Sequence, residues 1–214
     1  MNHYNRKRLE EDFDSLSEDS ELLSSSGSSF VSRSGEVVFS LLEPGLSDTV
    51  LDVGCGDGFL TTMVAGVCKK AIGVDISNTL LDRARHRALA EGIRNITFMR
   101  SSFEELFDEL TGVSVNKVMS NYAMHHLTDD MKESFIEKLA AFVSKPARIV
   151  IGDIMWFEDP EKIKEEWDSV CYDSGDTDFP ASAEFLKEIF LRNGARVRLT
   201  RLHSLVGIIC AELE

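Results

Sequence analysis

Three glycines at every second position, Gly54, Gly56 and Gly58, follow the apolar run of residues 50–53. Such a run is typical of a central strand in a parallel sheet, and glycines let a ligand lie directly against the backbone. The helix predicted to follow would point its N-terminal amides at that ligand. An acid, Asp75, ends the next apolar segment, where a carboxylate can bind ribose hydroxyls. Together these residues predict a Rossmann-like nucleoside site.

The spacing of the glycines separates two kinds of nucleoside ligand. A dinucleotide site has the pattern G-x-G-x-x-G, with a pyrophosphate at the helix N-terminus. Here the third glycine comes one residue earlier, and Asp52 lies just before the loop. An acid at this position suits a ligand with an ammonium and a sulfonium group better than one with two phosphates. The pattern therefore argues against a nicotinamide dehydrogenase.

Two adjacent histidines, His125 and His126, follow a predicted strand over residues 115–120. Imidazole titrates near neutral pH, so either could take a proton from a hydroxyl, thiol or amine. Asp153, at the end of a predicted strand over residues 147–153, could orient a histidine or bind an acceptor amine. Structural roles explain the same residues: one imidazole packs on the sheet, the other caps the next helix, and Asp153 is a turn residue. The sequence predicts His125, His126 and Asp153 as catalytic residues but leaves both explanations open.

The stretch that begins at Asn121 ends in His-His-Leu. With the glycine loop and Asp75, it resembles the class I S-adenosylmethionine-dependent methyltransferases, in particular the small-molecule branch that includes the ubiquinone/menaquinone-type enzymes. The resemblance covers roughly residues 35–214. It implies an α/β fold with a Rossmann-like, mostly parallel seven-stranded sheet of order 3-2-1-4-5-7-6, the last strand antiparallel. It also implies helices on both faces, an N-terminal helical lid, S-adenosylmethionine as methyl donor and S-adenosylhomocysteine as product.

The family's motifs assign a cofactor site in this chain. The glycine loop would hold the methionine end, the acid after the second strand the ribose, and a polar residue after the third strand the adenine. The assigned residues are Asp52, Gly54, Cys55, Gly56, Gly58, Asp75, Ile76, Ser102, Phe103 and Asn121. The family usually has an acid where this chain has Ser102. A hydroxyl can still accept from the adenine amino group, so we expect a weaker adenine contact there.

Strands and helices are predicted to alternate along most of the chain. The predicted strands are 49–53, 70–75, 95–100, 115–120 and 147–153; the predicted helices are 35–42, 58–68, 78–91, 103–109, 128–143 and 182–192. This alternation indicates βαβ units with right-handed crossovers. The remaining residues 195–213 read as two strands that break near His203.

Two segments outside the motifs are candidates for the acceptor side. Within residues 1–34, Leu9, Phe13 and Leu16 fall at near-helical spacing, and a serine-rich linker follows over residues 24–29. Tyr4 or Phe13 could cover the active site. We predict a lid there, with a flexible tail as the alternative. The predicted insertion over residues 154–180, within the domain of residues 35–214, is rich in acids and aromatic residues. Its aromatic residues either line a substrate pocket or form a small core of their own; they are Trp156, Trp167, Tyr172 and Phe179.

Composition limits the partners. The net charge of −14 weighs against nucleic acid, because that affinity depends on Lys and Arg. The cysteines Cys55, Cys68, Cys171 and Cys210 form no C-x-x-C pair, which argues against a zinc site and for a reducing cytosol. No apolar run is long enough to span a bilayer, and no signal peptide is expected. We therefore predict a cytoplasmic protein with no metal site.

The leading hypothesis is methyl transfer to an O, N or S atom of a small molecule. A protein or tRNA methyltransferase is a second possibility. The acidity weighs against it, as does the lack of an Asn/Asp-Pro-Pro-Tyr-type motif after the fourth strand. A third is a non-catalytic subunit or sensor that binds S-adenosylmethionine. The acceptor and the oligomeric state cannot be read from these motifs.

Overall fold

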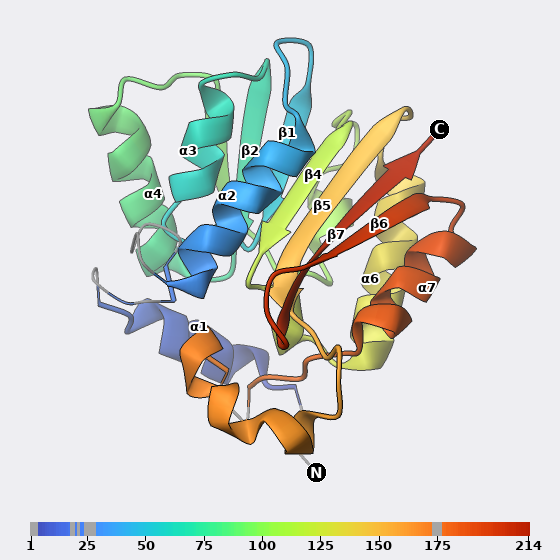
Figure 1. The fold of residues 1–214 in the computed structure, drawn as a ribbon. Helices are drawn as coiled ribbons and strands as arrows, with labels where there is room; N and C mark the ends of the chain where they lie inside the picture. Colours follow the sequence, from blue (N-terminus) through green and yellow to red (C-terminus); the bar gives the residue numbers. More distant parts are fainter. Residues whose placement is uncertain (1–3, 18–19, 21, 24–28, 173–176) are drawn as a thin grey trace.

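A seven-stranded sheet forms the centre of the computed structural model, which describes residues 4–17, 20, 22–23, 29–172 and 177–214. Its strands are β1 (Thr49–Val53), β2 (Lys70–Asp75), β3 (Ile96–Arg100), β4 (Lys117–Asn121), β5 (Ala147–Ile154), β6 (Arg196–Arg201) and β7 (Val206–Leu213). Their order is β3-β2-β1-β4-β5-β7-β6 (Figure 1). The first five strands pair in parallel, and β7 is antiparallel to both β5 and β6. The predicted fold class and strand order are confirmed.

Helices cover both faces of the sheet (Figure 1). They are α1 (Arg6–Asp14), α2 (Phe30–Leu42), α3 (Phe59–Ala65), α4 (Asn78–Ala90), α5 (Leu106–Glu109), α6 (Asp129–Phe142) and α7 (Ala183–Arg192), with the 3₁₀ segments η2 (Met124–His126), η3 (Pro160–Glu166) and η4 (Asp168–Val170). One apolar cluster joins α2 and α3 to the sheet, and another joins α6 and α7 to the opposite face.

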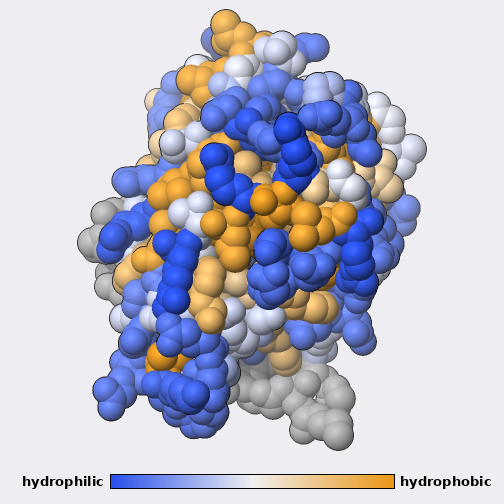
Figure 2. All heavy atoms as spheres, turned by 45° about the vertical axis from the view of Figure 1, so that its right-hand side comes forward, coloured by the Kyte–Doolittle hydropathy of each residue, from blue (hydrophilic) through white to orange (hydrophobic). Residues whose placement is uncertain are grey.

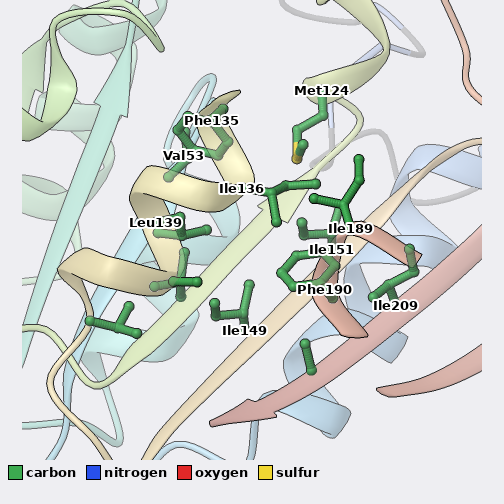
Figure 3. Packing of buried hydrophobic residues seen from close by; sticks show 14 of the residues in the cluster. Val53, Met124, Phe135, Ile136, Leu139, Ile149, Ile151, Ile189, Phe190 and Ile209 are labelled. Carbon is green, nitrogen blue, oxygen red and sulfur yellow. The ribbon is translucent and has the colours of Figure 1, made fainter. Parts of the chain in front are cut away.

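Strand β5 shows why the central strands are apolar without alternation. Ile149 and Ile151 point to the side of α6 and α7, where Ile136 and Phe190 pack against them (Figure 3). Val150, between them, belongs to the cluster on the opposite face. Because both faces are covered, seven of the eight positions of β5 are buried. The carboxyl ends of β1, β2, β4 and β5 are thereby held at one rigid edge.

Helix α2 begins earlier than the sequence predicted. The helix expected over residues 35–42 starts at Phe30, because the Ser29 hydroxyl caps it by accepting from the Ser32 amide at 3.3 Å. The predicted division between residues 34 and 35 thus falls inside α2. Residues 24–28 of the predicted linker lie outside the described residues.

The segment between β5 and α7 packs in a small apolar cluster that also includes Val31 of α2 and Val206 of β7. The Tyr172 ring lies 5.2 Å from that of Trp156 and 4.9 Å from that of Trp167. Ile163 and Val170 belong to the same cluster. These aromatic residues were predicted either to line a substrate pocket or to form a small core. For Trp156, Trp167 and Tyr172 the structure favours packing in a core.

Two of the three arginines of β6 are paired with acids. Arg196 bonds to Glu212 and Glu214, and Arg201 to Glu158. Figure 2 shows this side of the molecule, where hydrophilic and apolar residues intermingle. These arginines therefore make no unpaired basic patch for a phosphate backbone. Among the described residues, every helix is too short or too polar to cross a membrane.

Candidate active site

The loop between β1 and α3 depends on glycine for two different reasons. Gly54 and Gly56 both have left-handed backbones, with φ of 73° and 53°. A Cβ on Gly54 would lie 2.3 Å from the Cβ of Ala123, whereas a Cβ on Gly56 would meet nothing within 4 Å. Gly54 is therefore required for packing against the segment after β4. The space beside Gly56 is left for a ligand.

Asp75, at the end of β2, holds the glycine loop. Its Oδ2 accepts from the Gly56 amide at 2.8 Å, and its Oδ1 accepts from the Ser77 amide at 2.9 Å. Burial raises the pKa of this carboxyl, against the effect of these amide bonds. The carboxylate is thus fixed in place at the edge of a cavity.

Asp52 is turned away from that cavity. Its buried Oδ2 accepts from the Thr61 hydroxyl of α3 at 2.6 Å. Burial is the main cause that raises the pKa of Asp52 to about 7. The side chain joins β1 to α3, and its predicted role in cofactor binding stays a prediction.

A cavity of about 840 Å³, partly open to solvent, lies at the carboxyl edge of the sheet. Nine of the predicted site residues line it: Gly54, Cys55, Gly56, Asp75, Ile76, Ser102, Phe103, Asn121 and His126. Asp52, Gly58, His125 and Asp153 are not among the lining residues. Gly58 instead packs closely on α4, since a Cβ there would lie 2.6 Å from the Cβ of Ala84.

Ser102, at the position usually held by an acid, is already engaged. Its hydroxyl donates to Glu105 Oε2 at 3.1 Å and accepts from the Glu105 amide at 3.3 Å. It lines the cavity but shares its bonding capacity with the start of α5, and the weak adenine contact expected for it stays a prediction.

His125 and Asp153 form a buried pair. The imidazole Nδ1 lies 2.6 Å from Asp153 Oδ1, and the His125 amide donates to Asp153 Oδ2 at 2.9 Å. Burial by itself lowers the pKa of His125, but the carboxylates of Asp153 and Asp178 outweigh it, and the net pKa is raised. Both contacts fix the imidazole, so Asp153 orients His125 as one of its two predicted roles requires.

His126 is the histidine that reaches the cavity. Its Nδ1 lies 3.0 Å from Asp178 Oδ1 and 3.1 Å from the Thr177 carbonyl oxygen. Burial and the neighbouring His125 lower the pKa of its imidazole. The centroids of the two imidazole rings are 4.0 Å apart. Two histidines in one chemical environment thus have pKa values shifted in opposite directions.

The segment of residues 177–179 is hydrogen-bonded to the histidine segment. The Phe179 amide donates to the His125 carbonyl at 2.6 Å. On the other side, Lys132 is buried in α6 and its ammonium donates to the carbonyl oxygens of Phe179 and Leu127. These bonds hold Asp178, whose side chain is only 4% exposed, beside both imidazoles.

The N-terminal segment contributes to the cavity, and Figure 1 shows its helix α1 near the edge of the sheet where β4 and β5 end. Tyr4, Leu9, Phe13, Leu22 and Leu23 contribute to the cavity lining. The Phe13 ring meets the His126 ring edge-on, with centroids 5.2 Å apart. Apolar side chains of this segment therefore form one wall of the cavity.

Polar contacts attach this segment to the start of α4. Asp14 Oδ1 accepts from the Ser77 hydroxyl at 2.5 Å and from the Thr79 amide at 3.1 Å. Arg83 donates to the Leu16 carbonyl at 2.5 Å. The segment is thus bound next to Asp75, and its predicted role as a lid stays a prediction.

Comparison with known proteins agrees with this geometry. Residues 50–146 match a family model described as a methyltransferase domain. The fold is similar to that of magnesium protoporphyrin IX methyltransferase from Synechocystis with bound SAH. The TM-score is 0.69 at 17% identity, over 98% of this chain and 100% of that chain. Residues 50–146 thus match a methyltransferase domain in sequence, and the whole chain has the fold of a class I methyltransferase. The resemblance predicted from the sequence is confirmed.

Proteins similar to this chain in sequence are also described as methyltransferases. An uncharacterized methyltransferase of Oceanobacillus iheyensis is 31% identical over 121 residues, which are 56% of this chain and 53% of the relative. The match therefore spans about half of that relative's length. An uncharacterized methyltransferase of Bacillus cytotoxicus is 26% identical over 75% of each chain.

Two residues of the candidate site, Asp178 and Lys132, were not recognised in the sequence. In the sequence, Asp178 is one of several acids in the predicted insertion, because no motif near it links it to the histidines. Lys132 carries a signal: with Phe135, Ile136 and Leu139 it has helical spacing on the buried face of α6. A lysine on such a face requires buried partners, here two carbonyl oxygens.

Proposed function

We propose that this chain transfers a methyl group from S-adenosylmethionine to an O, N or S nucleophile of a small-molecule acceptor. The observation that carries the proposal is a single cavity with two chemically different ends. The open space beside Gly56 and the Asp75 carboxylate lie at one end, and the His126 imidazole lies at the other.

The cofactor-side residues fit the proposed donor. Asp75 would bind the ribose hydroxyls, the backbone at Gly54 and Gly56 would lie against the methionine portion, and Ser102 would contact the adenine. S-adenosylmethionine, when bound, supplies a methyl group on a sulfonium that leaves as a neutral thioether. The protein's task is to align the acceptor atom and exclude water, which can contribute about 7–11 kcal/mol.

The acceptor end would supply proton chemistry. His126 faces the cavity, and His125, held by Asp153, lies behind it. With Asp178 they form an acceptor-activating cluster, in which the two histidines and Asp153 take the catalytic roles predicted from the sequence. Such activation is needed when the acceptor is a hydroxyl, thiol or ammonium that arrives protonated.

The shape and lining of the cavity support a small acceptor. Phe13, Leu9 and Leu23 come from the N-terminal segment and would cover an apolar body. The excess of acidic residues disfavours a phosphate-rich acceptor. A sensor that only binds the donor would need no lined space between the glycine loop and two histidines, so this space favours the enzyme.

Calorimetry tests the proposal directly. We expect wild type to bind S-adenosylmethionine and S-adenosylhomocysteine at micromolar concentrations and to bind NAD far more weakly. Asp75→Ala removes a charged hydrogen-bond acceptor, which is worth about 1.5–3 kcal/mol and corresponds to roughly 10–100-fold weaker binding. Asp82→Ala, an exposed change on α4, is the matched control and leaves affinity unchanged. Preference for NAD, or equal binding by Asp75→Ala, would refute the proposed donor site.

A further inference from the structure

Three side chains at the acceptor end have the composition of a metal site. His125, His126 and Asp178 each offer a ligand atom, and these atoms all lie within 4.8 Å of one another. Two imidazoles and one carboxylate are a common ligand set for catalytic zinc and for ferrous iron. They come from η2 and from the distant segment of residues 177–179, so chain folding and not local sequence brings them together.

The distances to the shared carboxylate suit an ion. Asp178 Oδ1 lies 3.7 Å from His125 Nε2 and 3.0 Å from His126 Nδ1. Two ligands bound at about 2.0–2.1 Å to a tetrahedral ion are about 3.3–3.4 Å apart. The observed distances lie on either side of that separation. An ion can therefore replace the protons between Asp178 and each imidazole, while the two imidazole nitrogens, within 4.8 Å of each other, would move closer together.

The groups behind the ligands are arranged as in metal centres. Metal-bound histidines commonly donate their second ring N–H to a carboxylate or a backbone carbonyl. His125 Nδ1 makes such a contact with Asp153 at 2.6 Å, which leaves Nε2 facing Asp178. The Lys132 and His125 bonds to Phe179 limit the movement of Asp178. The site is held in place before any ion arrives.

Charge balance points the same way. The side chains of Asp153 and Asp178 are 2% and 4% exposed, and they lie on opposite sides of the His125 ring. Two carboxylates out of water need compensating positive charge. Lys132 supplies one positive charge nearby, and a divalent ion between the two neutral imidazoles would supply the remainder.

We propose that His125, His126 and Asp178 bind a divalent transition-metal ion, with Asp153 orienting His125. Because His126 lines the cavity, the remaining coordination position would face the acceptor. An acceptor hydroxyl or thiol bound there loses its proton more readily, since a coordinated oxygen or sulfur becomes more acidic. This catalytic role rests on the proposed methyl transfer, whereas ion binding itself does not.

Titration of the metal-free, full-length protein with Co²⁺ tests the site. We expect one ion to bind, with visible absorption bands of a low-symmetry N/O site, and Zn²⁺ to displace it. His126→Ala and Asp178→Asn should weaken Co²⁺ binding by 100-fold or more. Asp153→Asn, behind the ligands, should weaken it by about 10–100-fold. His86→Ala, an exposed histidine on α4, is the matched control and should bind Co²⁺ as wild type does.

Calorimetry with S-adenosylhomocysteine on the same preparations separates the two proposals and reports folding. Wild type that binds S-adenosylhomocysteine but gives no saturable Co²⁺ spectrum would overturn the metal site and leave methyl transfer standing. Equal Co²⁺ binding by folded His126→Ala and Asp178→Asn would also overturn it. Co²⁺ binding that the ligand variants lose, in a protein that binds no S-adenosylhomocysteine, would support the metal site alone.

Discussion

The two ends of the cavity differ in the chemical groups that form them. The donor end consists mainly of backbone, with the Gly56 and Ser77 amides donating to the carboxylate of Asp75. The acceptor end consists of side chains, where two imidazoles and two carboxylates lie in contact and a buried ammonium is linked to them through Phe179. Backbone sites recognise a ligand through shape, and their tolerance to change is set by sterics. Side-chain clusters respond to protons, ions and charge, so the two ends should fail in different ways when altered.

The largest effect expected is a pH dependence of the free energy of unfolding, caused by Asp52 near the donor end. The pKa of buried Asp52 is about 7 when folded, above its ordinary value of 3.8. The contribution of protonated Asp52 to the free energy of unfolding is fully present below pH 3.8. It is lost as the pH rises toward 7, because Asp52 then releases its proton readily only in the unfolded chain. Three pKa units correspond to roughly 4 kcal/mol. Asp52→Asn should therefore gain stability relative to wild type between pH 4 and 7.5.

Urea unfolding of both proteins at several pH values measures this difference. The control is Asp82→Asn, whose side chain is exposed on α4 and whose stability should follow wild type throughout. A constant difference between Asp52→Asn and wild type across this range would contradict the raised pKa.

The next effect distinguishes two glycines of the same loop. Gly54→Ala adds a left-handed backbone penalty of about 1–2 kcal/mol to a clash with Ala123, for a total of about 3 kcal/mol. Gly56→Ala incurs only the backbone penalty. Denaturant melts should rank them in that order, and Ala123→Gly should partly rescue Gly54→Ala. A failed rescue would show that the clash is not the cause.

At the acceptor end we expect a smaller loss from Lys132→Met. The change leaves the buried carbonyls of Leu127 and Phe179 without their common donor, which should cost about 2 kcal/mol of unfolding free energy. Lys138→Met, on the exposed side of α6, should cost little. S-adenosylhomocysteine binding should survive in both. Its loss in folded Lys132→Met would mean that the two ends are not independent.

The smallest effect concerns the wall that both ends share. Phe13→Ala removes the edge contact with His126, worth about 0.5–1.5 kcal/mol, so the N-terminal segment should detach more often. Limited trypsin cleavage at Arg6–Arg8 should accelerate a few-fold, and S-adenosylhomocysteine should slow it. Phe30→Ala, which removes a ring packed on His203 instead, serves as control. Equal cleavage of both variants would argue against a lid.

Much of the fold and of the donor end could be predicted because their causes are local. Strands β1 and β2 were predicted with their observed bounds, since each is a short apolar run bounded by polar residues. The glycine pattern and Asp75 depend on backbone conformation within a few residues. The early start of α2 was missed because its Ser29 cap lies in a serine-rich run that reads as a linker.

The acceptor end could be predicted only in part. His125 and His126 are visible as a pair, but the sequence does not show that only His126 reaches the cavity. Nor does it show Asp178, which the bonds from Phe179 to His125 and Lys132 place there. The prediction of no metal site considered cysteine spacing, and that reasoning could not detect ligands assembled from distant segments.

Ser77 connects two parts of the molecule through one residue. Its amide donates to Asp75, and its hydroxyl donates to Asp14 of the N-terminal segment. Detachment of that segment frees the hydroxyl, and any ligand that pulls on Asp75 disturbs the amide of the same residue. Hydrogen–deuterium exchange at the Ser77 amide should therefore report both events, which makes this one backbone proton a sensor of how closure and donor binding are coupled.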